Sequence, residues 1–337
     1  MRAIGIEEFG GPEVLRPMTL PQPVPLPTEL LVKVRAAGVN PLDLRTRAGF
    51  STPAAAALGT SPHILGWDVS GVVEEAGGGV HLFAPGDEVF GLLWLPRPAG
   101  AYAEYVTAPS RQFARKPGNV DHAHAAAVPL AGLTAWQALT EIAQLKPGQR
   151  ILIHAAGGGV GHLAVQIAKK LGAYVIGTAS QSKHDWLRGL GADEMVDYRT
   201  VSFEDVVDEV DVVLDLVGIA QPDTSVRSLS VLRPDGLFVG VAPGVPAGFS
   251  QLARAAGIRT SLDLLVEPDG HGLSQLAALI ESGELKVNVE KQFDLLDAVA
   301  AHQWAEQNRS SGKVVLTISE LKQPGVPWET PTTDTTQ

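Results

Sequence analysis

Four closely spaced glycines are the first feature of this sequence that could do chemistry. They are Gly157, Gly158, Gly159 and Gly161 in the stretch AGGGVG, which has the spacing G-x-G-x-x-G with Ala156 in place of the first glycine. A pyrophosphate can lie on backbone N–H groups at a helix start only where no Cβ stands in the way, and the helix dipole favours its negative charge. The spacing therefore predicts the pyrophosphate site of a dinucleotide, although a glycine-rich turn without a ligand has the same local sequence.

Which dinucleotide binds depends on the charge that follows the second strand of such a unit. A carboxylate there holds the ribose 2′-hydroxyl of NADH and would repel the 2′-phosphate of NADPH. Residues 176–183 contain no acid, whereas Ser180 offers a hydroxyl, Lys183 a positive charge and Tyr198 a phenol. These three side chains favour NADPH, with the alternative that Lys183 is a solvated surface lysine. Asp185 would argue against NADPH only if it pointed into the site, and it suits the first turn of the next helix equally well.

The elements that must position these residues alternate between strands and helices. An apolar run of strand length at 151–153 precedes the glycines, a helical pattern follows until Gly172, and 174–176 makes a second strand. The further elements that we expect are a helix at 133–145, a helical stretch at 203–209, and strands at 212–214, 237–239 and 258–266. About six strands in this order predict an α/β Rossmann domain with a doubly wound parallel sheet.

The first 120 or so residues have a different pattern. Short strand-like pieces such as 30–37 and 69–76 alternate with turns, which predicts a compact, mostly β, barrel-like domain. Near the other end, 273–281 and 295–307 have the periodicity of amphipathic helices. A final strand at 313–318 has no partner still to come, so we expect it to pair back into the first domain.

Composition excludes several classes of function. The 337 residues carry a net charge of −11, which argues against nucleic acid or an anionic membrane as the main partner. No apolar run approaches the roughly 18 residues of a membrane span and no signal peptide is recognisable, so we expect a cytoplasmic protein. Cysteine is absent, and the closest histidines, His122 and His124, lie in an alanine-rich stretch that does not favour a metal. Residues 321–337, rich in proline and threonine, are expected to form a mobile tail.

Five short motifs, spread over nearly the whole chain, are more telling together than singly. They are GGPEVL at 10–15, AGVNPLD at 37–43, LGWDVSG at 65–71, LGAD at 190–193 and GKVVL at 312–316. With the glycine turn between them, they make the chain resemble the medium-chain dehydrogenase/reductase superfamily and, within it, the zinc-independent quinone oxidoreductases related to zeta-crystallin. The resemblance implies two domains, which are a GroES-like β-barrel-type catalytic domain over 1–121 and 268–320 and a Rossmann NADPH-binding domain over 122–267.

The zinc ligands of that superfamily have no counterparts here. By the resemblance, Asn40 stands where zinc-containing members have a cysteine and Trp67 where they have a histidine, and Asp68 alone does not make a zinc site. Hydride donation to a quinone or an activated C=C bond needs less help than alcohol oxidation, because the acceptor delocalises the charge onto its own oxygen. The resemblance therefore implies a zinc-free reductase with Asn40 near the nicotinamide. Asn40 would donate one hydrogen bond to the acceptor, or would only form the turn before Pro41.

Further cofactor contacts follow from the resemblance, residue by residue. They are Thr134 near the nicotinamide ribose, Gly158, Gly159 and Val160 at the pyrophosphate, Val217 after the fourth strand, Val239 and Val241 beside the nicotinamide amide, and Lys313 near the last strand. For the three valines, simple packing in the core is an equal alternative. The small apolar residues 51–58 are expected to line or rim the acceptor pocket.

The sequence leaves alternative functions open. The first is an NADPH-dependent reductase that transfers a hydride to a quinone. A close variant reduces the activated C=C bond of enones, 2-alkenals or enoyl thioesters, and no motif separates the two. The other is a non-catalytic NADPH-binding protein, and the acidic charge speaks against a nucleic-acid role for it. We expect a small electrophilic substrate and, by the resemblance, a homodimer.

Overall fold

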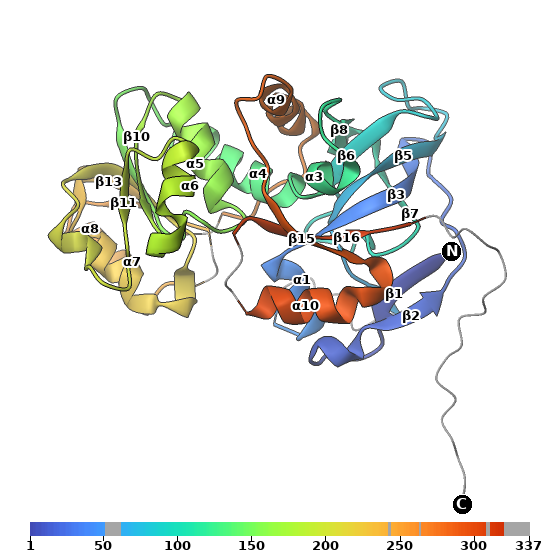
Figure 1. Ribbon diagram of the computed structural model, residues 1–337, viewed down its shortest axis with the longest axis horizontal. Helices are drawn as coiled ribbons and strands as arrows, with labels where there is room; N and C mark the ends of the chain where they lie inside the picture. The colour runs from blue at the N-terminus through green and yellow to red at the C-terminus, as the bar shows by residue number, and fades with distance from the viewer. Residues whose placement is uncertain (51–61, 242–243, 263, 308–310, 320–337) are drawn as a thin grey trace, which may run out of the picture.

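The protein has two parts that lie side by side, as a computed structural model shows (Figure 1). The structure describes residues 1–50, 62–241, 244–262, 264–307 and 311–319. One part holds a parallel sheet between helices, and the other holds a larger, mostly antiparallel sheet. This arrangement confirms the expected α/β fold class. The segment 51–58 and the tail 321–337, for which the sequence suggested roles, lie outside the described residues.

The first part is built on six parallel strands in the order β11-β10-β9-β12-β13-β14. Their bounds are β9 (Arg150–Ile153), β10 (Tyr174–Thr178), β11 (Glu194–Val196), β12 (Val210–Asp215), β13 (Leu232–Gly240) and β14 (Arg259–Ser261). The helices around them include α5 (Gly161–Lys170), α6 (His184–Gly189), α7 (Pro222–Ser228) and α8 (Phe249–Ala255). Strand order reverses between β9 and β12, so a ligand crevice is expected at the carboxyl ends of these two strands.

The second part contains a seven-stranded and a three-stranded sheet. The larger has the order β15-β16-β3-β5-β6-β8, with β7 beside β3, and the smaller has the order β2-β1-β4. The bounds are β1 (Arg2–Ile6), β2 (Arg16–Thr19), β3 (Glu29–Val39), β4 (His63–Ile64), β5 (Asp68–Ala76), β6 (Glu88–Leu92), β7 (Tyr105–Pro109), β8 (Phe113–Arg115), β15 (Val289–Asp294) and β16 (Lys313–Thr317). Strand pairing among the described residues forms no closed barrel.

The last strand returns to the N-terminal part of the chain, as expected. β16 pairs antiparallel with β3, with Val314 opposite Val39. It also pairs in parallel with β15, a strand that sequence periodicity did not reveal because its side chains alternate only between exposed and half-buried positions. The two expected C-terminal helices are present as α9 (Gly270–Glu281) and, after a 3₁₀ turn, α10 (Ala298–Glu306).

Three expected elements of the first part have different bounds. The prediction of a strand at 258–266 is wrong beyond β14, because Val266 does not continue in the sheet and is buried in the core cluster that also holds Leu133 and Leu273. The helical stretch at 203–209 is only a 3₁₀ turn, Phe203–Asp205, which the buried Phe203 anchors before β12 begins. The helix expected at 133–145 is α4 (Pro129–Gln137), which begins earlier with proline in its first position and continues as a π-turn.

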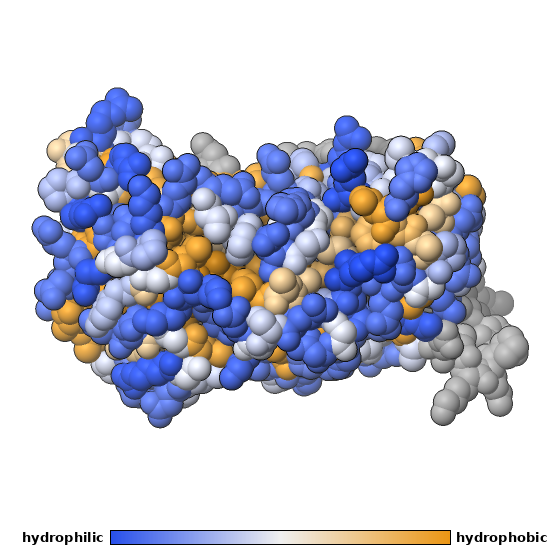
Figure 2. Space-filling view, turned by 90° about the horizontal axis from the view of Figure 1, so that it is seen from above, coloured by the Kyte–Doolittle hydropathy of each residue, from blue (hydrophilic) through white to orange (hydrophobic). Residues whose placement is uncertain are grey.

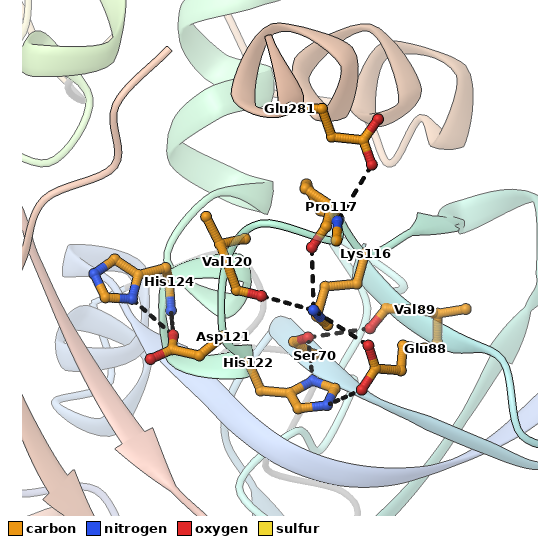
Figure 3. Close-up of polar contacts among 11 residues, drawn as sticks. Ser70, Glu88, Val89, Lys116, Pro117, Val120, Asp121, His122, His124 and Glu281 are labelled. Atoms are coloured by element: carbon orange, nitrogen blue, oxygen red, sulfur yellow. Dashed lines mark hydrogen bonds and ion pairs between the residues drawn. The ribbon is translucent and has the colours of Figure 1, made fainter. Parts of the chain in front are cut away.

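A polar cluster fixes the segment that leads from β8 to α3 (His122–Ala126) (Figure 3). Lys116, whose side chain is 6% exposed, donates to the carbonyl of Val120 at 2.6 Å and lies 3.2 Å from Glu88. His122 places Nδ1 2.8 Å from Ser70 Oγ and Nε2 3.3 Å from the Glu88 carboxylate, whereas His124 contacts the helix-capping aspartate. Both histidines therefore have structural partners. The domain boundary that we expected at 121/122 stays a prediction.

The outer surface is mostly hydrophilic on the face seen in Figure 2, with apolar patches over both halves of the molecule. Within the described ranges, none of the helices has both the length and the apolar character that crossing a membrane requires.

Candidate dinucleotide and acceptor site

At three glycines of the turn between β9 and α5 an added side chain would meet neighbouring atoms. A Cβ on Gly161 would lie 2.3 Å from the carbonyl oxygen of Ala155, and one on Gly157 would lie 2.6 Å from Cδ of Lys183. A Cβ on Gly159 would lie 3.0 Å from Cδ of Lys313, which comes from the other part of the molecule. The sequence spacing thus produces a bare backbone turn at the start of a ten-residue helix, the geometry that an anion requires.

A cleft with a volume of about 670 Å³ opens at this turn. It lies over the carboxyl ends of β9, β10 and β12, where the strand order reverses, and reaches α1 (Pro41–Arg47) and β16. The charged side chains that line it are all cationic, and in the described part of the chain no carboxylate does so; they are Lys183, Arg199, Arg227 and Lys313. Of these, Arg227 is paired with Glu204 at 3.0 Å.

One end of the cleft gathers the residues predicted to recognise a 2′-phosphate. Ser180, Lys183 and Tyr198 all line it, and Nζ of Lys183 lies 3.5 Å from the carbonyl oxygen of Gly157. Burial lowers the pKa of Lys183, the carboxylate of Glu290 opposes this shift, and the guanidinium of Arg199 adds to it. Arg199 stacks its guanidinium 5.7 Å from the Tyr198 ring. Sequence reasoning missed Arg199, although its position directly after Tyr198 was a usable signal.

The opposite end of the cleft is built around Asn40, which precedes α1. The side chain is buried, its Nδ2 donates to Asp68 Oδ2 at 2.9 Å, and its Oδ1 accepts a hydrogen bond from Nζ of Lys313. Because an ammonium only donates and a carboxylate only accepts, these two partners fix which way the amide points. The second N–H of the Asn40 amide has no partner among the described residues and is the group left to meet a ligand.

Two buried carboxylates support this end of the site. Asp68 accepts from the backbone N–H of Leu130 at 2.7 Å and lies 3.6 Å from Nζ of Lys313. Asp43 accepts from the backbone N–H groups of Asn40 at 2.8 Å and of Gly66 at 3.0 Å. Burial raises the pKa of both acids, that of Asp43 to about 7, and lowers the pKa of Lys313. Asp43, Asp68 and Lys313 are thus buried together at this end of the cleft.

The other predicted contacts divide between the cleft and the core. Gly158, Gly159, Val160, Val217 and Lys313 line the cleft, as do Asn40 and the three residues at its phosphate end.

The remaining three do not line it. Thr134 donates to the carbonyl of Leu130 within its own helix, Val239 is fully buried, and Val241 packs against the core and donates its N–H to the carbonyl of Asp215. Their roles as cofactor contacts stay predictions.

The two positions that matter for zinc are used differently here. Trp67 is buried in the core and donates its indole N–H to the carbonyl of Arg97 at 2.7 Å. Asn40 is bound to Lys313 and Asp68. In the ranges that the structure describes, no group of three or more His, Cys, Asp or Glu side chains could hold a metal ion.

Comparison with known proteins agrees with this architecture. Residues 26–118 match the alcohol dehydrogenase GroES-like domain and residues 190–316 match the zinc-binding dehydrogenase family. A 2-haloacrylate reductase of a Burkholderia species is 35% identical, over 92% of this chain and 97% of its own length. The chain belongs to the medium-chain dehydrogenase/reductase superfamily.

Solved structures of this superfamily extend the likeness to the three-dimensional fold. The quinone oxidoreductase of Coxiella burnetii is 36% identical with a TM-score of 0.88, and the match covers 95% of this chain and 99% of that one. The Escherichia coli quinone oxidoreductase complexed with NADPH is 30% identical with a TM-score of 0.81, over 94% and 100% of the two chains. The protein is thus an NAD(P)H-dependent oxidoreductase of this superfamily, with its GroES-like and Rossmann-like domains, consistent with the zeta-crystallin-like branch.

Proposed function

We propose that the protein is an NADPH-dependent, zinc-independent reductase that transfers a hydride to a quinone. The observation that carries this proposal is the charge of the cleft. A chain with a net charge of −11 lines this cleft with cations and with no carboxylate among the described residues. Such a lining is suited to a ligand with several phosphates, and the carboxylate that would select NADH is missing from the phosphate end.

The residues present fit a phosphorylated dinucleotide. The backbone N–H groups of residues 157–161, at the start of α5, would hold the pyrophosphate, because the glycines place no side chain over them. Ser180, Lys183, Tyr198 and Arg199 would hold the 2′-phosphate through hydroxyl and charge-assisted hydrogen bonds. The reduced nicotinamide, when bound, supplies the hydride.

The protein's own contribution to the reaction is centred on Asn40. Its amide oxygen is held by Lys313 and one N–H by Asp68, so only an N–H donor remains for the acceptor. An N–H donor stabilises negative charge that develops on a carbonyl oxygen. The neighbouring cleft wall is apolar, with Pro41 and Leu44, which suits a flat ring more than a charged substrate. Orientation and one hydrogen bond are what a quinone requires.

A reductase of activated C=C bonds is the second candidate. Its substrates, such as enones, 2-alkenals and enoyl thioesters, also carry a carbonyl oxygen that would accept from Asn40. The 35% identity to a 2-haloacrylate reductase favours this variant. Steady-state rates with 1,4-naphthoquinone and with a series of 2-alkenals, measured side by side, decide between the two. A preference for the alkenals would refute the quinone as acceptor but would leave the proposed cofactor unchanged.

The cofactor proposal is tested by the variant Lys183→Ala. Hydrogen bonds to charged groups contribute about 1.5–3 kcal/mol, so the KM for NADPH should rise about 10- to 100-fold while the KM for NADH stays within about twofold. Lys170→Ala is the matched control, since Lys170 is an exposed lysine paired only with Glu284 and does not line the cleft. Equal use of NADH and NADPH by the unmodified protein would refute the cofactor choice.

We also propose a homodimer, with the sheet edge at β14 as the contact. β14 ends the six-stranded sheet, and the described residues place no strand on its outer side. A groove of about 490 Å³ lies beside it, and Leu265 on its rim is 55% exposed. An open strand edge beside an exposed leucine is a surface that another chain can cover. Light scattering after size-exclusion chromatography measures the mass, and a monomer would refute the assignment.

A further inference from the structure

A chain of hydrogen bonds joins the glycine turn to the acceptor end of the cleft through His162. Its Nδ1 lies 3.0 Å from the carbonyl oxygen of Gly158, and its Nε2 accepts from the backbone N–H of Asn288 at 3.3 Å. The carbonyl of Asn288 accepts from the backbone N–H of Lys313 at 2.9 Å, and Nζ of Lys313 donates to the side chain of Asn40. The chain therefore crosses from α5 in one part of the molecule to β16 in the other.

The two partners of His162 determine its protonation. A carbonyl oxygen only accepts, so Nδ1 must carry a proton, and a backbone N–H only donates, so Nε2 must present a lone pair. His162 is fully buried and stacks on Trp186 at 5.9 Å between ring centroids. Burial lowers its pKa to about 4, so the neutral ring persists at physiological pH. Both of its nitrogen atoms are thus used in bridging two backbone segments.

The segment that receives this bridge is packed closely against the glycine turn. Cδ of Lys313 fills the space that a Cβ on Gly159 would need, and the backbone of Gly312 is so close to Asn288 that an added Cβ would lie 2.2 Å from its carbonyl oxygen. A pyrophosphate on the turn would therefore lie close to the stem of Lys313. Lys313 in turn holds the amide of Asn40 in its donating orientation.

We propose that His162 is a positioning residue, which couples occupation of the glycine turn to the placement of Lys313 and Asn40 at the acceptor. This inference rests on the proposed function, since it concerns the same cleft. His162 does not line the cleft and acts only through Asn288 and Lys313. Hydride transfer requires that the N–H donor of Asn40 be aligned with the nicotinamide of a dinucleotide whose pyrophosphate lies on the turn. His162 would maintain this alignment.

Gln166, one turn further along α5, provides a matched control. Its side chain donates to the carbonyl of Lys286 at 2.9 Å and accepts from the N–H of Lys286 at 2.8 Å, so it ties the same two parts of the molecule together. It also donates to the carbonyl of His162 at 2.8 Å, but among the described residues its side chain makes no hydrogen bond to the glycine turn or to Lys313. H162F removes one hydrogen bond between the two parts, to Asn288, and one to Gly158 in the turn, whereas Q166L removes two between the parts, to Lys286, and one to the carbonyl of His162. Both variants keep an apolar side chain in the space.

The test combines single-turnover kinetics with hydrogen–deuterium exchange. In H162F the hydride-transfer rate should fall roughly 10- to 100-fold, as misplacement of catalytic groups does, while Q166L stays within about threefold of the unmodified protein. Addition of NADPH should slow exchange in peptides covering 156–162 and 311–316 of the unmodified protein and of Q166L. In H162F only the first peptide should gain protection.

Two results would overturn the proposal. These are equal losses of rate in H162F and Q166L, or protection of 311–316 by NADPH in H162F. Should H162F fail to fold, H162Q, which can satisfy one of the two partners, should give an intermediate rate and partial protection, and unmodified values for H162Q would overturn the coupling. If the unmodified protein reduces no acceptor, the proposed function fails, whereas the exchange comparison still tests the coupling.

Discussion

Replacement of Lys313 by methionine tests the buried charge cluster beneath the acceptor site. Nζ of Lys313 lies 3.6 Å from Asp68 Oδ2, and the two side chains are 4% and 0% exposed. Methionine keeps most of the apolar stem but leaves the carboxylate of Asp68 without its cation. Removing one partner of a buried ion pair costs about 3–5 kcal/mol. This is a large share of the roughly 5–15 kcal/mol that stabilises a typical fold.

The loss of stability in Lys313→Met should depend on pH in a definite direction. Burial raises the pKa of Asp68 above its ordinary value of 3.8, and Lys313 opposes that rise. Without Lys313 the pKa of Asp68 in the folded state rises further, whereas its value in the unfolded state does not change. An acid whose pKa is raised by folding destabilises the fold above that pKa, and the loss is recovered as pH falls toward 3.8. The stability gap between the unmodified protein and Lys313→Met should therefore narrow as pH falls.

Urea unfolding, followed by tryptophan fluorescence between pH 8 and pH 5, measures the gap. The double variant Lys313→Met with Asp68→Asn should recover part of the loss at pH 8, because no unpaired ion remains buried. A gap of less than about 1 kcal/mol at pH 8, or a gap that does not change with pH, would refute the buried-pair reasoning.

Three further predictions concern other parts of the site and its support. Burial raises the pKa of Asp43 to about 7. The free energy of unfolding should therefore rise by up to about 1.4 kcal/mol per pH unit as pH falls from 7 toward 5, and urea unfolding of Asp43→Asn should lack this slope. Gly161→Ala places a methyl group 2.3 Å from a backbone oxygen, so fluorescence titration should show NADPH binding at least roughly tenfold weaker, whereas Gly158→Ala, at 3.3 Å, should have a smaller effect. Buried Arg47 lies 3.1 Å from Nδ1 of His302, so Arg47→Met should lower the free energy of unfolding by about 1.5–3 kcal/mol in thermal denaturation. Parallel pH curves, equal glycine effects or an unchanged Arg47 variant would contradict the respective argument.

Local sequence was sufficient for the turn that would hold the pyrophosphate. Its glycines, the strand before it and the helix after it are consecutive in the chain, so their geometry follows from short-range sterics. The absence of an acid at 176–183 is equally local, and the structure places Ser180, Lys183 and Tyr198 together in one cleft. Family motifs supplied Asn40 and Lys313 as candidates but not the contact between them.

Periodicity failed where tertiary packing decides. The residues after β14 are as apolar as a strand, yet Val266 is buried in the core cluster with residues of α4 and α9. β15 has a pattern too polar to be recognised as a strand, and it is held in place by its pairing with β16. Such segments pair their backbone hydrogen bonds, or bury their apolar side chains, against residues far away in the sequence. A periodicity computed over neighbouring residues does not include those partners.

The sequence by itself determined a cysteine-free, acidic chain with a dinucleotide turn and no carboxylate to repel a 2′-phosphate, because composition and spacing are sufficient for these properties. Only the tertiary structure decided that Asn40, Asp68, Lys313 and His162 form one connected system. They are separated by up to 273 positions in the chain, and their hydrogen bonds depend on strand register and burial that the fold creates. The orientation of the Asn40 amide, on which the proposed chemistry depends, follows from that assembly.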